Sequence, residues 1–207
     1  MRPIILVFMM LALPVLADVR VVDGDTLVID NVTYRINGID APEHGQSCGN
    51  WGCGQDATGA LADLVEGKDP QCQELGRDGY GRVIATCYVN GIDIGKALVQ
   101  GGKAWAFLRY SDTYMNDELA AKAKGLGIWS GHYQTPWEFR EERWNTEQQQ
   151  APNGCPIKGN ISRNGRIYHT PWSPWYSRTH INTAKGERWF CSEDEAVKAG
   201  WRAPYWD

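Results

Sequence analysis

Three carboxylates and one arginine stand out in the stretch Val21–Glu43, VVDGDTLVIDNVTYRINGIDAPE. They are Asp25, Arg35, Asp40 and Glu43. Carboxylates are the usual ligands of hard cations, and arginine binds phosphate through paired hydrogen bonds. The alternative is a surface hairpin with solvated charges. The combination favours a site that holds a metal ion and a phosphate group.

Two strands would position these side chains. Leu27–Ile29 and Val32–Ile36 are rich in β-branched and apolar residues, and Asp30-Asn31 between them is typical of a two-residue turn. This turn would place Thr26 opposite Arg35, with the preceding aspartate lying diagonally across. The acidic and basic groups would then meet at the end of the hairpin far from its turn.

The N-terminus predicts export. Residues 1–17 combine one basic residue, the apolar run Pro3–Val15 and the ending Leu16-Ala17, which is typical of a signal peptide cleaved after Ala17. The run is short for a membrane span, so an uncleaved anchor is the lesser alternative. We therefore expect a periplasmic or extracellular (secreted) protein without stable membrane association after cleavage.

The six cysteines agree with an oxidising compartment. Cys72 and Cys87 are symmetric about the turn-like segment Asp78–Gly81, so a hairpin centred there would place them opposite each other. Cys48 and Cys53 would close a small loop. Cys155 and Cys191 remain to pair in the C-terminal part, although with His169 and His180 they could instead form a zinc site.

Charge is unevenly distributed along the chain. Residues 18–150 hold 12 Lys and Arg against 20 Asp and Glu, whereas residues 155–207 hold 8 against 5. An acidic N-terminal part argues against binding nucleic acid by bulk attraction alone. Metal ions and local arginines would have to compensate.

The remaining pattern predicts a small mixed domain. Helices are expected over Gln55–Leu64, over Ile94–Val99, and from about Thr113 to Lys124 with Asp112 as its N-cap. A second hairpin is expected from Gln71–Leu75 and Val83–Val89, and a last strand from Lys103–Leu108. These elements indicate an α+β fold, an OB-fold five-stranded β-barrel with about three helices, over residues 18–137. Residues 138–154 are polar and predict a linker, and residues 155–207 predict a small, irregular, disulfide-linked module.

Five motifs resemble the staphylococcal nuclease (thermonuclease) family, in the family's order. They are VDGDT (22–26), YRINGIDAPE (34–43), RDGYGR (77–82), ALVQGG (97–102) and GLGIWSG (125–131). The resemblance covers roughly residues 19–132. It implies a Ca²⁺-dependent nuclease that hydrolyses phosphodiester bonds of DNA and/or RNA.

The resemblance also implies roles for single residues. Asp25 and Asp40 would be metal ligands, with the backbone carbonyl of Ala41. Arg35, Glu43 and Arg82 would be catalytic, the arginines on phosphate and the glutamate on the attacking water. Tyr80 and Tyr110 would lie near the bound nucleotide. Gly79 and Leu108 depart from the family, at positions where Lys and Tyr can occur.

The C-terminal module is less informative. Its KGNIS, YH and GERWFC segments are similar to a small module found on other exported bacterial proteins. It holds five of the ten tryptophans, which could stack on single-stranded nucleic acid or fill a small core. It could instead bind envelope polymer. A non-catalytic OB-fold nucleic-acid-binding or envelope-interaction protein is the alternative for the whole chain, which we expect to be a monomer.

Overall fold

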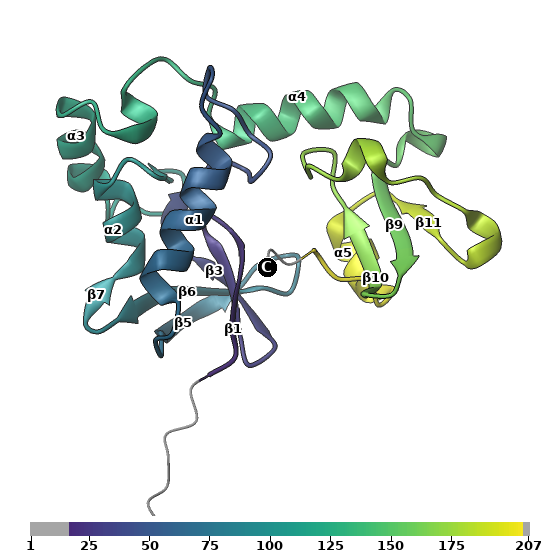
Figure 1. Cartoon of the computed structure of the whole chain (residues 1–207), viewed down its shortest axis with the longest axis horizontal. Coiled ribbons are helices and arrows are strands. Elements are labelled where there is room, and N and C mark those ends of the chain that lie inside the picture. The colour runs from purple at the N-terminus through teal and green to yellow at the C-terminus, as the bar shows by residue number, and fades with distance from the viewer. Residues whose placement is uncertain (1–16, 205–207) are drawn as a thin grey trace, which may run out of the picture.

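The computed structural model describes residues 17–204, which form two β-sheet units connected by a long helix (Figure 1). The predicted signal peptide lies outside the described residues except for Ala17. None of the helices within the described part of the chain is both long and apolar enough to cross a membrane.

The predicted hairpin is confirmed with its register. Strand β2 (Thr26–Ile29) pairs antiparallel with β3 (Val32–Ile36), so Ile29 lies opposite Val32 and Thr26 opposite Arg35. Both turn residues, Asp30 and Asn31, have positive φ, as a two-residue hairpin turn of the favoured twist requires. The hairpin therefore folds as its local sequence dictates.

The main sheet has the order β1-β2-β3-β6-β5. Its further strands are β1 (Val19–Asp23), β5 (Gln71–Arg77) and β6 (Val83–Val89), and β7 (Ile92–Asp93) pairs with β6. β3 and β6 pair in parallel, whereas the other neighbours are antiparallel. The short strands β4 (Ile39–Asp40) and β8 (Trp105–Ala106) form a separate ladder.

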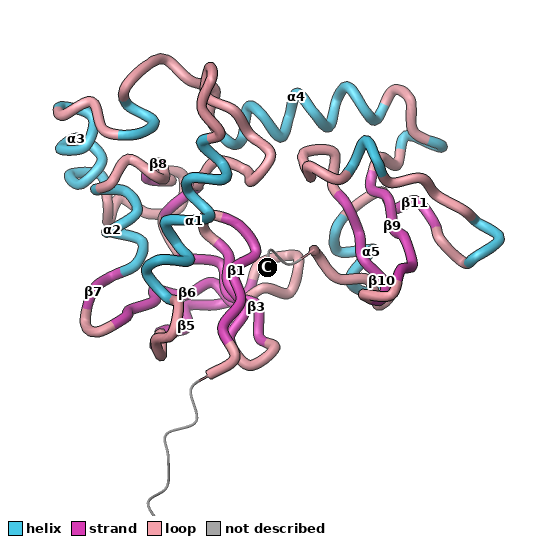
Figure 2. The backbone as a smooth tube through the Cα atoms, in the orientation of Figure 1, coloured by secondary structure: helices cyan, strands magenta, loops and turns pink. Residues whose placement is uncertain are grey.

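The mixed α+β class is confirmed, but among the described strands no ladder joins β5 back to β1. The predicted five-stranded barrel is therefore not closed by backbone hydrogen bonds. Three helices lie alongside the sheet as predicted: α1 (Cys53–Val65), α2 (Ile94–Gln100) and α3 (Met115–Ala123) (Figures 1 and 2). α1 packs on β1, α2 packs on β6, and α3 packs on α2. Their apolar faces share one core with the sheet, which includes Leu27, Leu61, Val83 and Leu98.

Two local expectations need correction. Tyr114, not Asp112, stands at the N-cap position of α3, without a side-chain cap hydrogen bond. In the second hairpin Cys72 pairs with Cys87 as expected, but a register shift between Glu74 and Gly76 changes the pairing beyond it. The extra residue of this bulge is absorbed in β5, a feature that the sequence pattern does not reveal.

The segment predicted as a polar linker is mostly helical. Helix α4 (Pro136–Gln148) begins with a capping box, in which Thr135 and Glu138 exchange side-chain to backbone hydrogen bonds, and Pro136 occupies its first turn. The segment predicted as a linker is therefore helical over most of its length, because this local start signal outweighs the polar composition. Figure 2 shows α4 running from the first unit to the second.

The C-terminal module is also more regular than expected. Strands β9 (Ile157–Ser162), β10 (Gly165–His169) and β11 (Arg188–Phe190) form an antiparallel sheet of order β10-β9-β11, with α5 (Glu193–Lys198) beside it. Its core contains Ile157, Tyr168, Phe190, Ala196 and Trp201. Short 3-10 helices are η1 (Gly127–Trp129), η2 (Pro152–Gly154), η3 (Tyr176–Arg178) and η4 (Thr183–Lys185).

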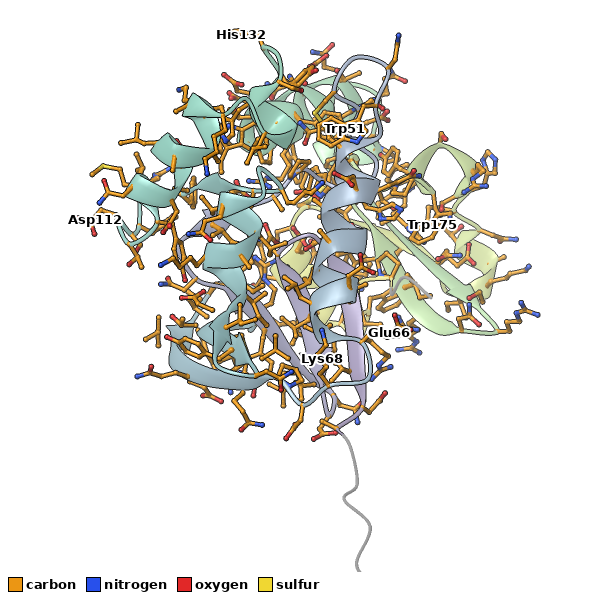
Figure 3. All side chains as sticks on the ribbon, turned by 60° about the vertical axis from the view of Figure 1, so that its left-hand side comes forward. Trp51, Glu66, Lys68, Asp112, His132 and Trp175 are labelled. Atoms are coloured by element: carbon orange, nitrogen blue, oxygen red, sulfur yellow. A yellow bond between two sulfur atoms is a disulfide. The ribbon has the colours of Figure 1, made fainter. Side chains whose placement is uncertain are left out.

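Three disulfides are present: Cys48–Cys53, Cys72–Cys87 and Cys155–Cys191. The last bond removes both cysteines from the alternative zinc set. His169 instead contacts Ser173 and Asn160. Figure 3 shows His132 on an outlying loop and Trp175 on the C-terminal module, with Trp51 and Glu66 near opposite ends of α1.

Candidate functional site

Asp25 and Arg35 form the inner part of the site. Asp25 lies in the turn between β1 and β2 and is only 4% exposed. Arg35 Nη1 forms an ion pair with Asp25 Oδ1, and Thr26 Oγ1 donates to the same oxygen at 3.0 Å. Close packing holds this turn, because a Cβ on Gly24 would lie 2.7 Å from the Cβ of Ala41. The hairpin therefore brings the acid and the arginine together as the sequence predicts.

Asp40 lies beside this pair. It is fully buried on β4, and its Oδ1 accepts a 2.7 Å hydrogen bond from Arg35 Nη2. The amide of Ala41 donates to Asp25 Oδ2 at 2.8 Å. Burial raises the pKa of Asp40, but the positive charges of Arg35 and Arg140 outweigh that effect and hold the pKa below its ordinary value. Asp40 therefore carries its negative charge at neutral pH.

The loop that follows Glu43 fixes its backbone, a contact that the sequence analysis does not predict. Its amide donates to Gln46 Oε1 at 3.2 Å, and its carbonyl accepts from the Gln46 amide at 2.7 Å. Gln46 is 2% exposed, and its Nε2 also donates to the Gln134 carbonyl at 2.7 Å. The Cys48–Cys53 disulfide ties the same loop to the first residue of α1. The backbone of Glu43 is therefore fixed from several directions.

The protonation of Glu43 suits proton transfer. Burial raises its pKa to about 7, with the negative charges of Asp23 and Asp40 adding to the shift and Arg140 opposing it. Burial likewise raises the pKa of Asp23, against the opposing charges of Arg35 and Arg82. A carboxyl group with a pKa near the working pH can accept and release a proton.

Arg82 reaches the site through the parallel pairing of β3 with β6, which places Arg35 opposite Ile84. Its Nε donates to Asp78 Oδ2 at 2.7 Å, and its guanidinium lies 5.3 Å from the centre of the Tyr80 ring. Burial lowers the pKa of Arg82, but the negative charges of Glu193 and Asp78 outweigh it and raise the pKa overall. Arg82 is therefore a fixed cation.

One cavity of about 890 Å³ gathers most of the predicted residues. Its lining includes Asp25, Arg35, Glu43, Tyr80, Arg82 and Tyr110. Asp40 and Ala41 are buried next to it, whereas Tyr110 is 73% exposed at its edge. Phe107 contacts Tyr110 edge to face at 5.1 Å and stacks on Trp137 at 5.6 Å. The cavity thus combines an acidic floor, three arginines and an aromatic rim.

Several lining residues were missed from the sequence. Arg140 on α4 and Glu193 on α5 line the cavity, as do the aromatic side chains Trp144 and Trp172. Arg140 and Glu193 lie about a hundred residues or more after Glu43 in the chain. No motif in their local sequence indicates that they belong to the site. Asp23, which also lines the cavity, could have been found from its place in the VDGDT motif.

The donor chemistry is of the kind that suits a hard divalent cation, because Asp25 and Asp40 both supply carboxylate oxygens, and both pair with Arg35. Within residues 17–204, no group of three or more His, Cys, Asp or Glu side chains could hold a metal ion. The candidate set contains only two carboxylates and a backbone carbonyl. Guanidinium groups of Arg35 and Arg140 lie against these carboxylates.

Comparisons with known proteins agree with the motifs. The family described as Staphylococcal nuclease homologue matches residues 33–131, and a family described as ArfC matches residues 142–203. Micrococcal nuclease of Shigella flexneri is 32% identical over 162 residues, which cover 67% of this chain and 90% of that protein.

Two further relatives have a comparable sequence identity to this chain. A protein named "Uncharacterized endonuclease" of Escherichia coli is 34% identical over 133 residues, covering 60% of this chain and 84% of that protein. Succinoglycan biosynthesis protein ExoI of Rhizobium meliloti is 34% identical over 126 residues, covering 56% of this chain. The chain spans 65% of that last protein, just under two thirds of its length.

Proposed function

Because the chain belongs to the staphylococcal nuclease family, we propose that it is an exported, Ca²⁺-dependent nuclease that hydrolyses phosphodiester bonds of DNA and/or RNA. The observation that carries the proposal is the meeting of Arg35, Glu43 and Arg82 in one cavity beside the Asp25–Asp40 pair. Three disulfides support export to an oxidising compartment.

The two arginines would bind and stabilise the scissile phosphate. Arg35 reaches the cavity from β3 and Arg82 from the residue just before β6, and each can donate two hydrogen bonds to non-bridging oxygens. These bonds strengthen as negative charge develops in the transition state. Asp78 holds Arg82 through Nε, which leaves the terminal nitrogens to face the substrate.

Glu43 would activate the attacking water. Its pKa of about 7 and its rigid backbone suit a general base that takes one proton from water as the phosphorus is attacked. Asp25, Asp40 and the Ala41 carbonyl would hold the Ca²⁺, which supplies positive charge to the phosphoryl oxygens. Tyr80 and Tyr110, both partly exposed at the cavity, offer surfaces on which bases can stack.

The test is cleavage of supercoiled plasmid and of single-stranded RNA, with Ca²⁺ and with chelator. We expect cleavage only with Ca²⁺, and a loss of orders of magnitude in Glu43→Gln and in Arg82→Ala. Glu66→Gln is the matched control, because Glu66 lies at the far end of α1 in Figure 3. Near-normal turnover in Glu43→Gln would reject the assigned roles, and tight binding without cleavage by the wild-type protein would support the non-catalytic alternative.

A further inference from the structure

The chain beyond residue 135 returns to the catalytic cavity with two oppositely charged side chains. Arg140 Nη2 donates to Asp40 Oδ2 at 2.7 Å, and Arg140 Nη1 donates to Asp40 Oδ1 at 3.1 Å. Nη1 also donates to Glu43 Oε1 at 2.7 Å. One guanidinium group therefore bridges a candidate metal ligand and the candidate general base.

This position conflicts with the proposed chemistry. A cation bound to Asp40 would lie close to the positive charge of Arg140, and like charges repel strongly in a partly buried site. Glu43 Oε1 already accepts from the positive guanidinium of Arg140, which lowers the basicity of this carboxylate toward a water molecule. Arg140 thus occupies oxygens that both the metal ion and the water require.

Glu193 presents the opposite charge to the phosphate-binding side of the cavity. It is the first residue of α5, and its Oε2 accepts a 2.8 Å hydrogen bond from the Tyr168 hydroxyl. Glu193 and Arg82 line the same two cavities, and the glutamate's negative charge raises the pKa of the Arg82 guanidinium against the lowering effect of burial. Glu193 therefore adds a negative charge to the wall of the cavity that also carries the arginine proposed to bind substrate phosphate.

Further contacts place the module against the nuclease part. Trp144 of α4 packs against the module core and lies 6.4 Å from Trp172, measured between ring centres. The Trp172 carbonyl lies so close to Gly45 that a Cβ there would be 3.0 Å away. Gly45 belongs to the loop that carries Glu43. The module is therefore packed directly beside the catalytic carboxylate.

From these contacts we propose that α4 and the C-terminal module form a built-in competitive inhibitor. In this closed state Arg140 takes the place of the metal cation, and Glu193 takes the place of a substrate phosphate opposite Arg82. Cation and nucleic acid bind after Arg140 and Glu193 withdraw. The inference rests on the proposed nuclease function and concerns the regulation of that same site.

The first test measures Ca²⁺ binding to the full chain by calorimetry, without nucleic acid. Arg140→Gln removes the competing charge, so we expect Ca²⁺ affinity to rise by about tenfold or more. Arg143→Gln is the matched control, because Arg143 lies on the same helix and its guanidinium stacks over Phe139. Arg140→Lys retains one charge without the two-pronged contact and should fall between the two.

Melting temperatures check that the variants fold and give a second readout. Without Ca²⁺, Arg140→Gln should melt below the wild type, because it loses three charge-assisted hydrogen bonds. The rise in melting temperature on adding Ca²⁺ should be larger than in the wild type, because the Arg140 guanidinium no longer has to be displaced from Asp40. If Arg140→Gln is folded and binds Ca²⁺ no more tightly than the wild type, the inhibitor proposal is overturned.

The second test addresses Glu193 with labelled oligothymidine in chelator, so that no cleavage occurs. Glu193→Gln should bind the oligonucleotide several-fold more tightly, whereas Asp194→Asn, at a half-buried neighbour that pairs with Lys198, should not. Equal effects of both substitutions would indicate only a general charge effect and contradict the proposal. If neither the wild type nor Arg140→Gln binds Ca²⁺ or cleaves, it is the proposed nuclease function that fails.

Discussion

The amide of Ala41 donates to Asp25 Oδ2 at 2.8 Å, so one hydrogen bond joins the turn before β2 to the end of β4. Asp25 therefore has two roles. One oxygen holds the backbone of the second acidic segment, and the other lies against Thr26 and Arg35. The carboxylate is both a charge and a structural acceptor.

Asp25→Asn should separate these roles. The asparagine carbonyl oxygen can still accept from Ala41, so we expect the fold to be retained while Ca²⁺ affinity falls by about tenfold or more. Asp25→Leu removes the acceptor as well and should lower the free energy of unfolding by about 1–3 kcal/mol more. Denaturant titration and calorimetry of the two variants measure both effects. Equal stability of the two variants would show that the Ala41 hydrogen bond has no structural role.

Glycines 54 and 59 provide a matched pair within α1. A Cβ on Gly54 would overlap the carbonyl of Glu43, whereas a Cβ on Gly59 would meet nothing within 4 Å. We expect Gly59→Ala to stabilise the protein by about 0.5–1 kcal/mol through higher helix propensity. Gly54→Ala should destabilise it by about 1–3 kcal/mol and lower turnover, because the backbone of Glu43 must move. A Gly54→Ala variant with normal turnover would show that this contact does not position the glutamate.

The disulfides Cys48–Cys53 and Cys72–Cys87 should differ in their effects on stability and on turnover. Replacing Cys72 and Cys87 by Ala opens a loop of sequence separation 15, which should cost about 3 kcal/mol of stability. Replacing Cys48 and Cys53 opens a separation of only 5 and should cost about 2 kcal/mol. The second variant should nevertheless lose more turnover at a temperature where both are folded, because its loop holds Glu43. The reverse order of turnover losses would contradict this assignment.

The burial of His169 predicts that the stability of the C-terminal module falls in acid. Burial, with the nearby charge of Lys158, lowers its pKa from 6.5 to about 4. Between pH 6.5 and 4, His169 therefore binds a proton in the unfolded chain but not in the folded chain. The free energy of unfolding falls as the pH is lowered from about 6.5 towards 4. The loss from this group is at most about 3 kcal/mol.

Denaturant titrations at pH 7 and pH 4.5 measure this loss. His169→Gln should reduce the difference in unfolding free energy between the two pH values. His132→Gln should leave the difference unchanged, because His132 is exposed on an outlying loop in Figure 3. An unchanged difference in His169→Gln would show that other groups cause the acid sensitivity.

Local sequence determined much of the first unit. The turn residues Asp30 and Asn31 set the register that places Thr26 opposite Arg35. Apolar spacing and helix-end signals located three helices, α1 to α3, within a few residues. The symmetry of Cys72 and Cys87 about their turn located one disulfide. Each of these features depends on residues close together in the chain, where turn chemistry and side-chain periodicity act directly.

Other features were decided only by tertiary structure. Arg82 meets Arg35 because β6 pairs in parallel with β3, and Gln46 supports Glu43 through a loop contact with Gln134. Arg140 contacts Asp40, which is 100 residues away in the chain. The sequence contains the capping signal at the start of its helix, but no local pattern predicts how that helix is oriented. Such contacts depend on how separate elements pack, and the packing surfaces carry no local pattern. The sequence by itself therefore predicted the candidate site residues, whereas only the folded chain placed the Arg140 guanidinium against Asp40 and Glu43.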